Sequence, residues 1–258
     1  MKNIEVFCFF CNFTEYFQLL LSMNNTVKKR KQLHFQMCLI FIASGFIAIV
    51  SCTKPDEPAD VGYNFFPHSP GHWMHYDVDS TVWDDFTSEV YNYNSQILEI
   101  VESAFTDGEG YPALRIERYY RKNDTMQWAI KDVWFANLKP ASAEIVEENV
   151  RFVKLAFPVK SNNNWNGNAF NYLPAETYSY DNINQSMTAG TQTYDSTVTV
   201  NHKETVNLIE EDIRYEVYAR NVGMIYKYTK TVEKNIAQPD AIVKGVLIEY
   251  TLRNYGPK

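Results

Sequence analysis

The feature that most constrains the fold is a period-two alternation of side-chain character that recurs along the chain. Successive residues of a β-strand point to opposite faces of a sheet, so this alternation is the pattern of a half-buried strand. Segments 114–120, 197–201 and 246–252 show it most clearly. One face of these segments carries Leu114, Ile116, Arg118 and Tyr120, then Val198 and Val200, then Val246, Ile248, Tyr250 and Leu252.

Aromatic residues and turn signals agree with this pattern. Seventeen of the 18 tyrosines and all five tryptophans follow residue 52, and aromatic side chains suit a pleated, half-buried surface. The run Asp107-Gly108-Glu109-Gly110 predicts a hairpin turn between strands at 97–101 and 114–120. Short strands without alternating helices favour antiparallel pairing. We therefore expect a mainly β fold, either one curved antiparallel sheet or a sandwich or half-barrel.

One segment departs from the period of two. Ile209, Ile213 and Val217 recur at every fourth position, which would place them on one face of a helix. Asn207 lies just before this run, and asparagine is a favourable helix N-cap. The pattern predicts one short helix over 208–219 within the β domain.

The N-terminal region has the layout of a secretory signal peptide. The basic cluster 28–31 is followed by an apolar run from Met37 to Val50, about 14 residues, whereas a membrane-spanning helix needs about 20. The run ends in Ile49-Val50-Ser51-Cys52, which resembles a bacterial lipobox. The resemblance implies that residues 1–52 are a leader and that Cys52 is acylated, which anchors the protein in a membrane.

We expect three parts in the chain. Residues 1–22 precede the basic cluster, where a signal peptide normally has nothing, so Met23 is the expected start of translation. Residues 53–62 are rich in proline and charge and predict a flexible tether, and 63–258 form a single β-rich domain. The charges of the tether resemble the acidic export signals of surface lipoproteins in Bacteroidota. The expected location is the outer membrane, facing the periplasm or the outside.

Cysteine placement and charge exclude several classes of protein. All four cysteines lie at or before Cys52, so the rest of the chain has no thiol for a disulfide, a nucleophile or a metal. Five of the 24 basic and two of the 31 acidic residues precede Cys52, which leaves 19 and 29, a net charge of −10. Because nucleic-acid binding needs a basic footprint, we expect no nucleic-acid partner.

Short aromatic and glycine motifs recur after the leader. They are Phe65-Phe66-Pro67 with Gly71–Tyr76, Lys154–Val159 with Trp165–Gly167, and Tyr218–Tyr226. These phrases resemble those of a group of Bacteroidota envelope lipoproteins. The resemblance spans most of the mature chain and implies a compact, largely antiparallel β domain. It implies no activity, cofactor or site residue.

The one cluster of possible metal ligands is His68, His72 and His75, which are three of the four histidines after Cys52. Imidazole is the commonest metal ligand at neutral pH. If this stretch is a strand, however, His72 and His75 point to opposite faces, and only a bulge or an early loop would bring all three together. We therefore expect no metal and no other cofactor.

The sequence leaves three functions open. The leading hypothesis is a non-catalytic cell-envelope lipoprotein that acts by binding or interaction, with an envelope protein, a lipid or a glycan as partner. The second is a carrier or receptor for a lipid or glycan, because Tyr and Trp suit stacking on sugars or lining an apolar cavity. The third is a metal-dependent enzyme that uses the His68–His75 region. An exposed aromatic row would favour a glycan, and a closed apolar cavity would favour a lipid.

Overall fold

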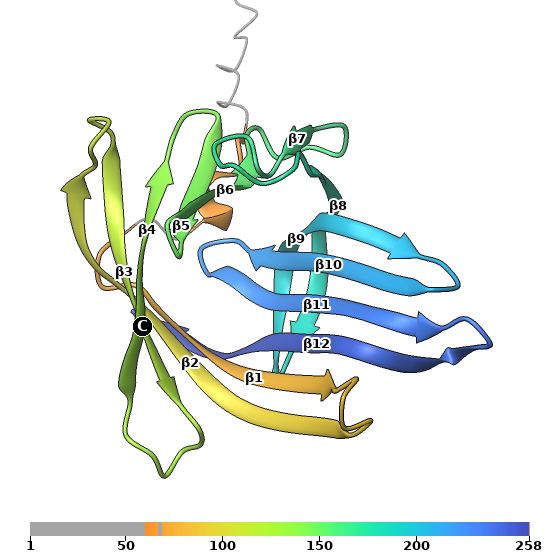
Figure 1. The fold of residues 1–258 in the computed structure, drawn as a ribbon. Helices are drawn as coiled ribbons and strands as arrows, with labels where there is room; N and C mark the ends of the chain where they lie inside the picture. The colour runs from red at the N-terminus through yellow and green to blue at the C-terminus, as the bar shows by residue number, and fades with distance from the viewer. Residues whose placement is uncertain (1–59, 67–68, 258) are drawn as a thin grey trace, which may run out of the picture. The chain divides into compact units, whose positions relative to one another are not determined.

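The computed structural model describes residues 60–66 and 69–257, which form one antiparallel sheet of 12 strands (Figure 1). The strands are β1 (Trp73–Trp83), β2 (Val90–Thr106), β3 (Pro112–Arg121), β4 (Ala129–Leu138), β5 (Ser142–Glu147), β6 (Val150–Ala156), β7 (Asn164–Asn166), β8 (Thr177–Ala189), β9 (Gln192–Val206), β10 (Glu210–Ala219), β11 (Gly223–Asn235) and β12 (Gln238–Gly256). Among the described residues the only helical element is the 3-10 turn η2 (Tyr63–Phe65). That part of the chain therefore contains no helix long and apolar enough to span a membrane.

The order of the strands follows the chain except at one junction. It runs β6-β5-β4-β3-β2-β1-β12-β11-β10-β9-β8-β7. Each pair of adjacent strands in the sheet is therefore also consecutive in the chain, except for the pair β1 and β12. The outermost strands β6 and β7 are consecutive in the chain and meet edge to edge. The Val153 amide donates to the Gly167 carbonyl (2.9 Å), and the Trp165 indole donates to the Val153 carbonyl (2.8 Å). These bonds nearly close the sheet into a barrel-like form with a concave interior.

The predicted β fold and its hairpin are confirmed. Strands β2 and β3 are joined by the predicted turn, where the Asp107 carboxylate accepts hydrogen bonds from the amides of Glu109 (3.0 Å) and Tyr111 (2.8 Å). Gly110 has a φ of 85°, a conformation that suits glycine. In β3, Ile116 and Arg118 are both buried on the interior face, as the alternation predicts.

The predicted helix over 208–219 is wrong, because this segment is strand β10. It pairs with β9 on one side and β11 on the other. The alternation of Ile213, Tyr215 and Val217 with more polar residues fits a strand as well as a helix, and β-branched and aromatic residues favour the strand. Asn207 does accept hydrogen bonds from the amides of Ile209 and Glu210 (both 2.9 Å), but in the β9–β10 turn rather than at a helix.

Two clusters of buried apolar side chains form the core. The first gathers residues of β3, β6, β8 and β9, with Leu155, Val198 and Val200 fully buried. The second gathers residues of β1, β10, β11 and β12, with Tyr76, Ile225 and Leu252 at its centre. Full burial of such side chains stabilises the fold by roughly 1.5–3 kcal/mol each.

Within the described residues, Asp60 and Val61, which precede the expected domain start at 63, already contact the domain. Arg220 forms an ion pair with Asp60 (2.6 Å) and covers the ring of Phe65 at 4.4 Å. Val159 donates its amide to the Val61 carbonyl (3.0 Å). The last residues of the expected tether are therefore bound to the domain, in part beside the end of β10. Cys52, Met23 and the rest of the leader and tether lie outside the described residues.

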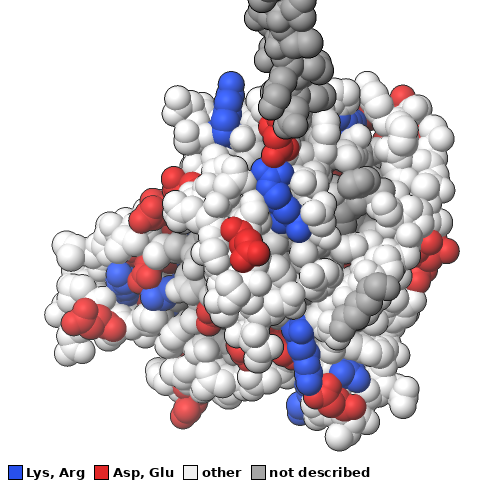
Figure 2. All heavy atoms as spheres, turned by 180° about the vertical axis from the view of Figure 1, so that it is seen from behind, with Lys and Arg blue, Asp and Glu red and all other residues white. Residues whose placement is uncertain are grey.

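Charged side chains are dispersed over the surface of the domain. On the face drawn in Figure 2, lysine and arginine are interspersed with aspartate and glutamate, and neither sign forms a continuous patch. Several charged side chains of the domain are paired, as in Arg214 with Glu176 (2.5 Å) and Arg253 with Asp124 (3.1 Å). This face therefore carries no extended basic footprint.

Candidate functional site

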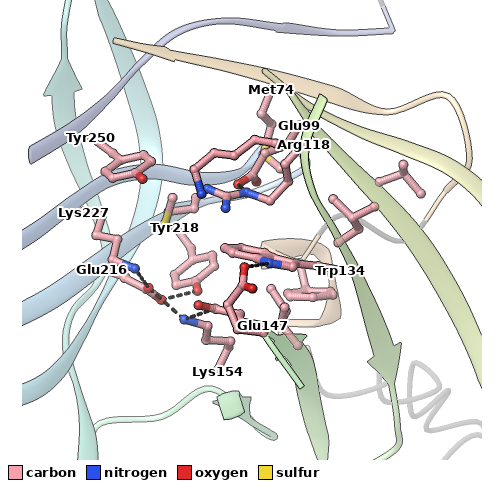
Figure 3. Close-up of a pocket in the computed structure, with 17 residues that line it drawn as sticks. Met74, Glu99, Arg118, Trp134, Glu147, Lys154, Glu216, Tyr218, Lys227 and Tyr250 are labelled. Atoms are coloured by element: carbon pink, nitrogen blue, oxygen red, sulfur yellow. Dashed lines mark hydrogen bonds and ion pairs between the residues drawn. The ribbon is translucent and has the colours of Figure 1, made fainter. Parts of the chain in front are cut away.

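The concave interior holds a partly open cavity of about 280 Å³. Strands from both halves of the sheet contribute to its wall (Figure 3). One part of the wall is apolar or aromatic, and the other carries charges. The apolar part includes Met74, Val101, Ile116, Trp134, Ile145 and Met224, and the charged part includes Glu99, Arg118, Glu147, Lys154, Glu216 and Lys227.

Lys154 reaches the interior because it is the extra residue of a β-bulge. Glu144 of β5 pairs with Val153, and Ala143 pairs with Leu155, which leaves Lys154 unpaired between them. A bulge re-aims a side chain, and such bulges often lie next to functional sites. The ammonium group contacts Glu147 (2.8 Å) and Glu216 (3.0 Å) in the cavity.

Glu216 is the centre of the charged side of the cavity. Its side chain is almost fully buried on β10 and accepts a hydrogen bond from the Tyr218 hydroxyl (2.6 Å). Lys227 of β11, directly opposite in the strand register, lies 3.4 Å away and is partly exposed at the opening. Figure 3 shows the two lysines on either side of this carboxylate.

A second ion-paired group covers the aromatic wall. Arg118 of β3 is buried and contacts Glu99 (2.8 Å) and Asp132 (2.9 Å). Its guanidinium lies 3.5 Å from the centroid of the Trp134 ring, a favourable cation–π geometry. The Trp134 indole donates to Glu148 (3.2 Å) near the opening, so the orientation of the ring is fixed at both its face and its edge.

The charged groups on the cavity floor are held in their ionised forms. Burial opposes the charge of Lys154, but Glu147 and Glu216 outweigh it and raise the pKa of Lys154. Burial likewise opposes the charge of Glu216, but Lys154 and the neighbouring cations lower its pKa well below the usual range. Lys154 and Glu216 are therefore held as fixed charges at pH 7.

His202 lies directly behind the floor of the cavity. It is the extra residue of another bulge, because Tyr215 pairs with Asn201 and Arg214 pairs with Lys203. Its ring stacks on that of Tyr178 (4.0 Å between centroids), and its Nε2 is 3.7 Å from Glu216 Oε2. Among the described residues, no hydrogen-bond partner is within reach of Nε2. Burial lowers the pKa of His202 to about 3, so the ring is neutral at pH 7.

Of the predicted histidine cluster, neither His72 nor His75 lines the cavity. His72 contacts the Val222 carbonyl through Nε2 (2.8 Å), whereas His75 lies on the outer face and contacts Gln96 (3.3 Å). His68 lies outside the described residues. Within residues 60–66 and 69–257, no three His, Cys, Asp or Glu side chains are grouped so that they could hold a metal ion.

Sequence reasoning missed most of the cavity residues. A signal was present, because Lys154 and Glu216 are single charges between apolar residues of strands, and such charges are rarely buried without a partner. The pairing itself was not visible in the sequence, since it depends on a bulge in β6 and on contact between distant strands.

Comparisons with known proteins do not place the chain in a family. No protein-family model matches the sequence, and no curated protein matches it. A candidate exported protein with a YmcC-like fold from Bacteroides fragilis superimposes with a TM-score of 0.39 at 10% identity, over 75% of this chain and 99% of that one. A candidate lipoprotein from Parabacteroides distasonis gives 0.38 at 14% identity, over 74% and 98%.

Proposed function

We propose that this protein is a lipid-anchored protein of the bacterial cell envelope whose domain binds a compact ligand in the interior cavity without catalysing a reaction. The proposed location in the cell envelope rests on the signal-peptide pattern and on the lipobox-like run that ends at Cys52. The outer membrane is the proposed location.

The observation that carries the binding proposal is the two-sided wall of the cavity. Met74, Ile116 and Trp134 offer an apolar surface, while Lys154 and Glu216 offer fixed charges on the other side. Concave sites with apolar walls and a few placed polar groups are typical of small-molecule binding. The ligand is therefore a molecule with an apolar body and polar or charged groups at one end.

The size and charge of the cavity narrow the ligand further. Its volume of about 280 Å³ lies just below the range of typical ligand pockets, so the ligand must be small. A long acyl chain would leave Lys154, Glu216 and Arg118 facing hydrocarbon, which costs free energy for charged groups. These charges are already paired inside the protein, so a ligand can add contacts to them without breaking the pairs.

Native mass spectrometry of the processed lipoprotein, extracted from its own envelope in a mild detergent, tests this proposal. We expect the protein to carry a small non-covalent ligand. Ile145→Trp should abolish this added mass, because Ile145 lines the cavity and the larger ring fills it. Val146→Trp is the matched control, because the next residue of β5 points to the opposite face and should leave the ligand bound.

Two outcomes would contradict the proposal. One is a wild-type protein that carries no ligand besides its lipid anchor in any detergent. The other is an added mass that Ile145→Trp retains at wild-type occupancy while circular dichroism shows that the variant is folded.

A further inference from the structure

A second hollow lies on the outer face of the sheet, apart from the interior cavity. Trp73 and His75 alternate with buried residues along β1, so their side chains point outward. The hollow has a volume of about 370 Å³ and an almost wholly apolar floor of Leu98 and Ile100. Its walls are the rings of Trp73, Trp128 and His75 together with Arg121.

Trp128 is held against this face by the connection between β3 and β4. The Arg121 guanidinium lies 4.4 Å from the centroid of the Trp128 ring, and the His75 ring meets it edge-on at 5.2 Å. Arg121 also forms an ion pair with Asp124 of the same connection (2.5 Å). On the other side, the Trp73 indole packs on Gly256, where an added Cβ would lie 2.4 Å from Nε1. Both tryptophans are therefore positioned before any ligand arrives.

A buried glutamine organises the polar groups beside the hollow. The Gln96 side chain donates to Asp77 (3.2 Å) and Asp124 (3.3 Å) and accepts a hydrogen bond from Arg121 (2.6 Å). Arg253 of β12 contacts the same two carboxylates, at 3.3 Å and 3.1 Å. Two arginines and two aspartates cancel in charge, so this network carries no net charge.

His75 separates the aromatic hollow from a polar one. The polar hollow has a volume of about 510 Å³ and includes Asp77, Thr251, Arg253 and Asn254. Gly190 and Thr191, at the turn between β8 and β9, form its far wall. Burial lowers the pKa of His75, which keeps the ring between the two hollows uncharged at pH 7.

We propose that these two hollows are adjacent subsites for a neutral oligosaccharide that crosses the outer face at His75. A pyranose ring has an apolar face of C–H groups, which suits the rings of Trp73 and Trp128. Its hydroxyl groups both donate and accept, which suits the carboxylates, guanidinium and amide of the polar hollow. The cancelled charges of the network favour an uncharged sugar chain over a polyanion. The proposal does not depend on what fills the interior cavity.

Isothermal titration calorimetry with four hexasaccharides tests this inference: cellohexaose, maltohexaose, laminarihexaose and mannohexaose. The processed lipoprotein is kept in a polyoxyethylene detergent, because a glycosidic detergent would compete for the site. We expect at least one hexasaccharide to bind, and Trp128→Ala to weaken its binding at least tenfold. Asn254→Ala, in the polar hollow, should also weaken the binding of that hexasaccharide. This second variant provides the test if Trp128→Ala fails to fold.

The control variant is Tyr93→Ala, because Tyr93 is an exposed aromatic residue farther along β2. Its affinity should equal that of the wild type. The proposal is overturned if none of the four hexasaccharides binds, or if Trp128→Ala and Asn254→Ala both bind with wild-type affinity. Loss of binding in Ile145→Trp with full binding in Trp128→Ala would place the sugar in the interior cavity and would also overturn it.

Discussion

Lys154 on β6 and Glu216 on β10 form a buried ion pair across the interior, with 3.0 Å between Nζ and Oε1. Their strands lie in opposite halves of the sheet order, so the pair joins the two halves through the cavity rather than through the backbone. Glu147 binds the same ammonium group. The same ion pair therefore forms part of the floor of the proposed binding cavity and holds distant parts of the fold together.

We predict that Lys154→Met lowers the free energy of unfolding by about 3–5 kcal/mol, because it removes the cation that contacts Glu147 and leaves the buried Glu216 with only the partly exposed Lys227. Adding Glu216→Gln to this variant should recover part of the loss, since one of the two buried carboxylates is then neutral. Urea unfolding followed by circular dichroism measures both effects.

Lys244→Met is the control for this prediction, because Lys244 pairs with Glu233 (3.1 Å) where both side chains are exposed. Exposed pairs contribute at most about 1 kcal/mol. Equal losses in the two variants would show that burial of the Lys154 pair does not matter to stability.

Because His202 is buried in its neutral form, we expect the protein to lose stability in mild acid. The pKa of its ring is about 3 in the folded protein against 6.5 for a free histidine, so below pH 6.5 the unfolded chain binds a proton that the folded chain does not. The stability contributed by the neutral ring is complete above pH 6.5 and falls by about 1.4 kcal/mol per pH unit below it, until pH 3.

We therefore expect His202→Gln to be less sensitive to acid than the wild type. Between pH 8 and pH 5 the wild type should lose about 2 kcal/mol more than the variant, measured by urea unfolding at both pH values. Parallel losses in the two proteins would mean that His202 takes up its proton in the folded state.

Gly245 predicts a strict requirement for glycine in β12. It has a φ of 136°, and an added Cβ would lie 2.3 Å from the Thr231 carbonyl oxygen on the neighbouring strand. Gly245→Ala should cost about 2–3 kcal/mol of stability, because either the backbone or β11 must move. Gly108→Ala, where nothing lies within 4 Å, should cost less than about 0.5 kcal/mol. Thermal unfolding of both variants measures the two losses of stability. A Gly245→Ala variant as stable as the wild type would contradict the register of β11 and β12.

The strands were predictable because a sheet with one buried face imposes a period of two. The alternation around Ile116 and around Leu252 placed both side chains on the buried face. The segment 208–219 was wrongly predicted to be a helix because the four-residue spacing of Ile213 and Val217 fits one face of a helix and one face of a strand equally well. Pairing with β9 and β11, which no local pattern reports, decides for the strand.

The site was less predictable than the fold, since it depends on bulges and on contacts between distant strands. Lys154 and His202 both occupy bulge positions, where one extra residue changes the face to which a side chain points. His75 attracted attention as a metal ligand, but its neighbours are Trp128 and Gln96, which come from other strands and from a connection. Arg118 shares a face with Ile116, as the alternation indicated, although its partners were not foreseen.

The most direct test of the central claim is a crystal structure of the lipoprotein purified from its own envelope without added ligands. We expect electron density for one compact molecule in the interior cavity, with its apolar part against Trp134 and its polar part toward Lys154 and Glu216. Density that fits only separate water molecules at that position would contradict the claim that this cavity is the binding site.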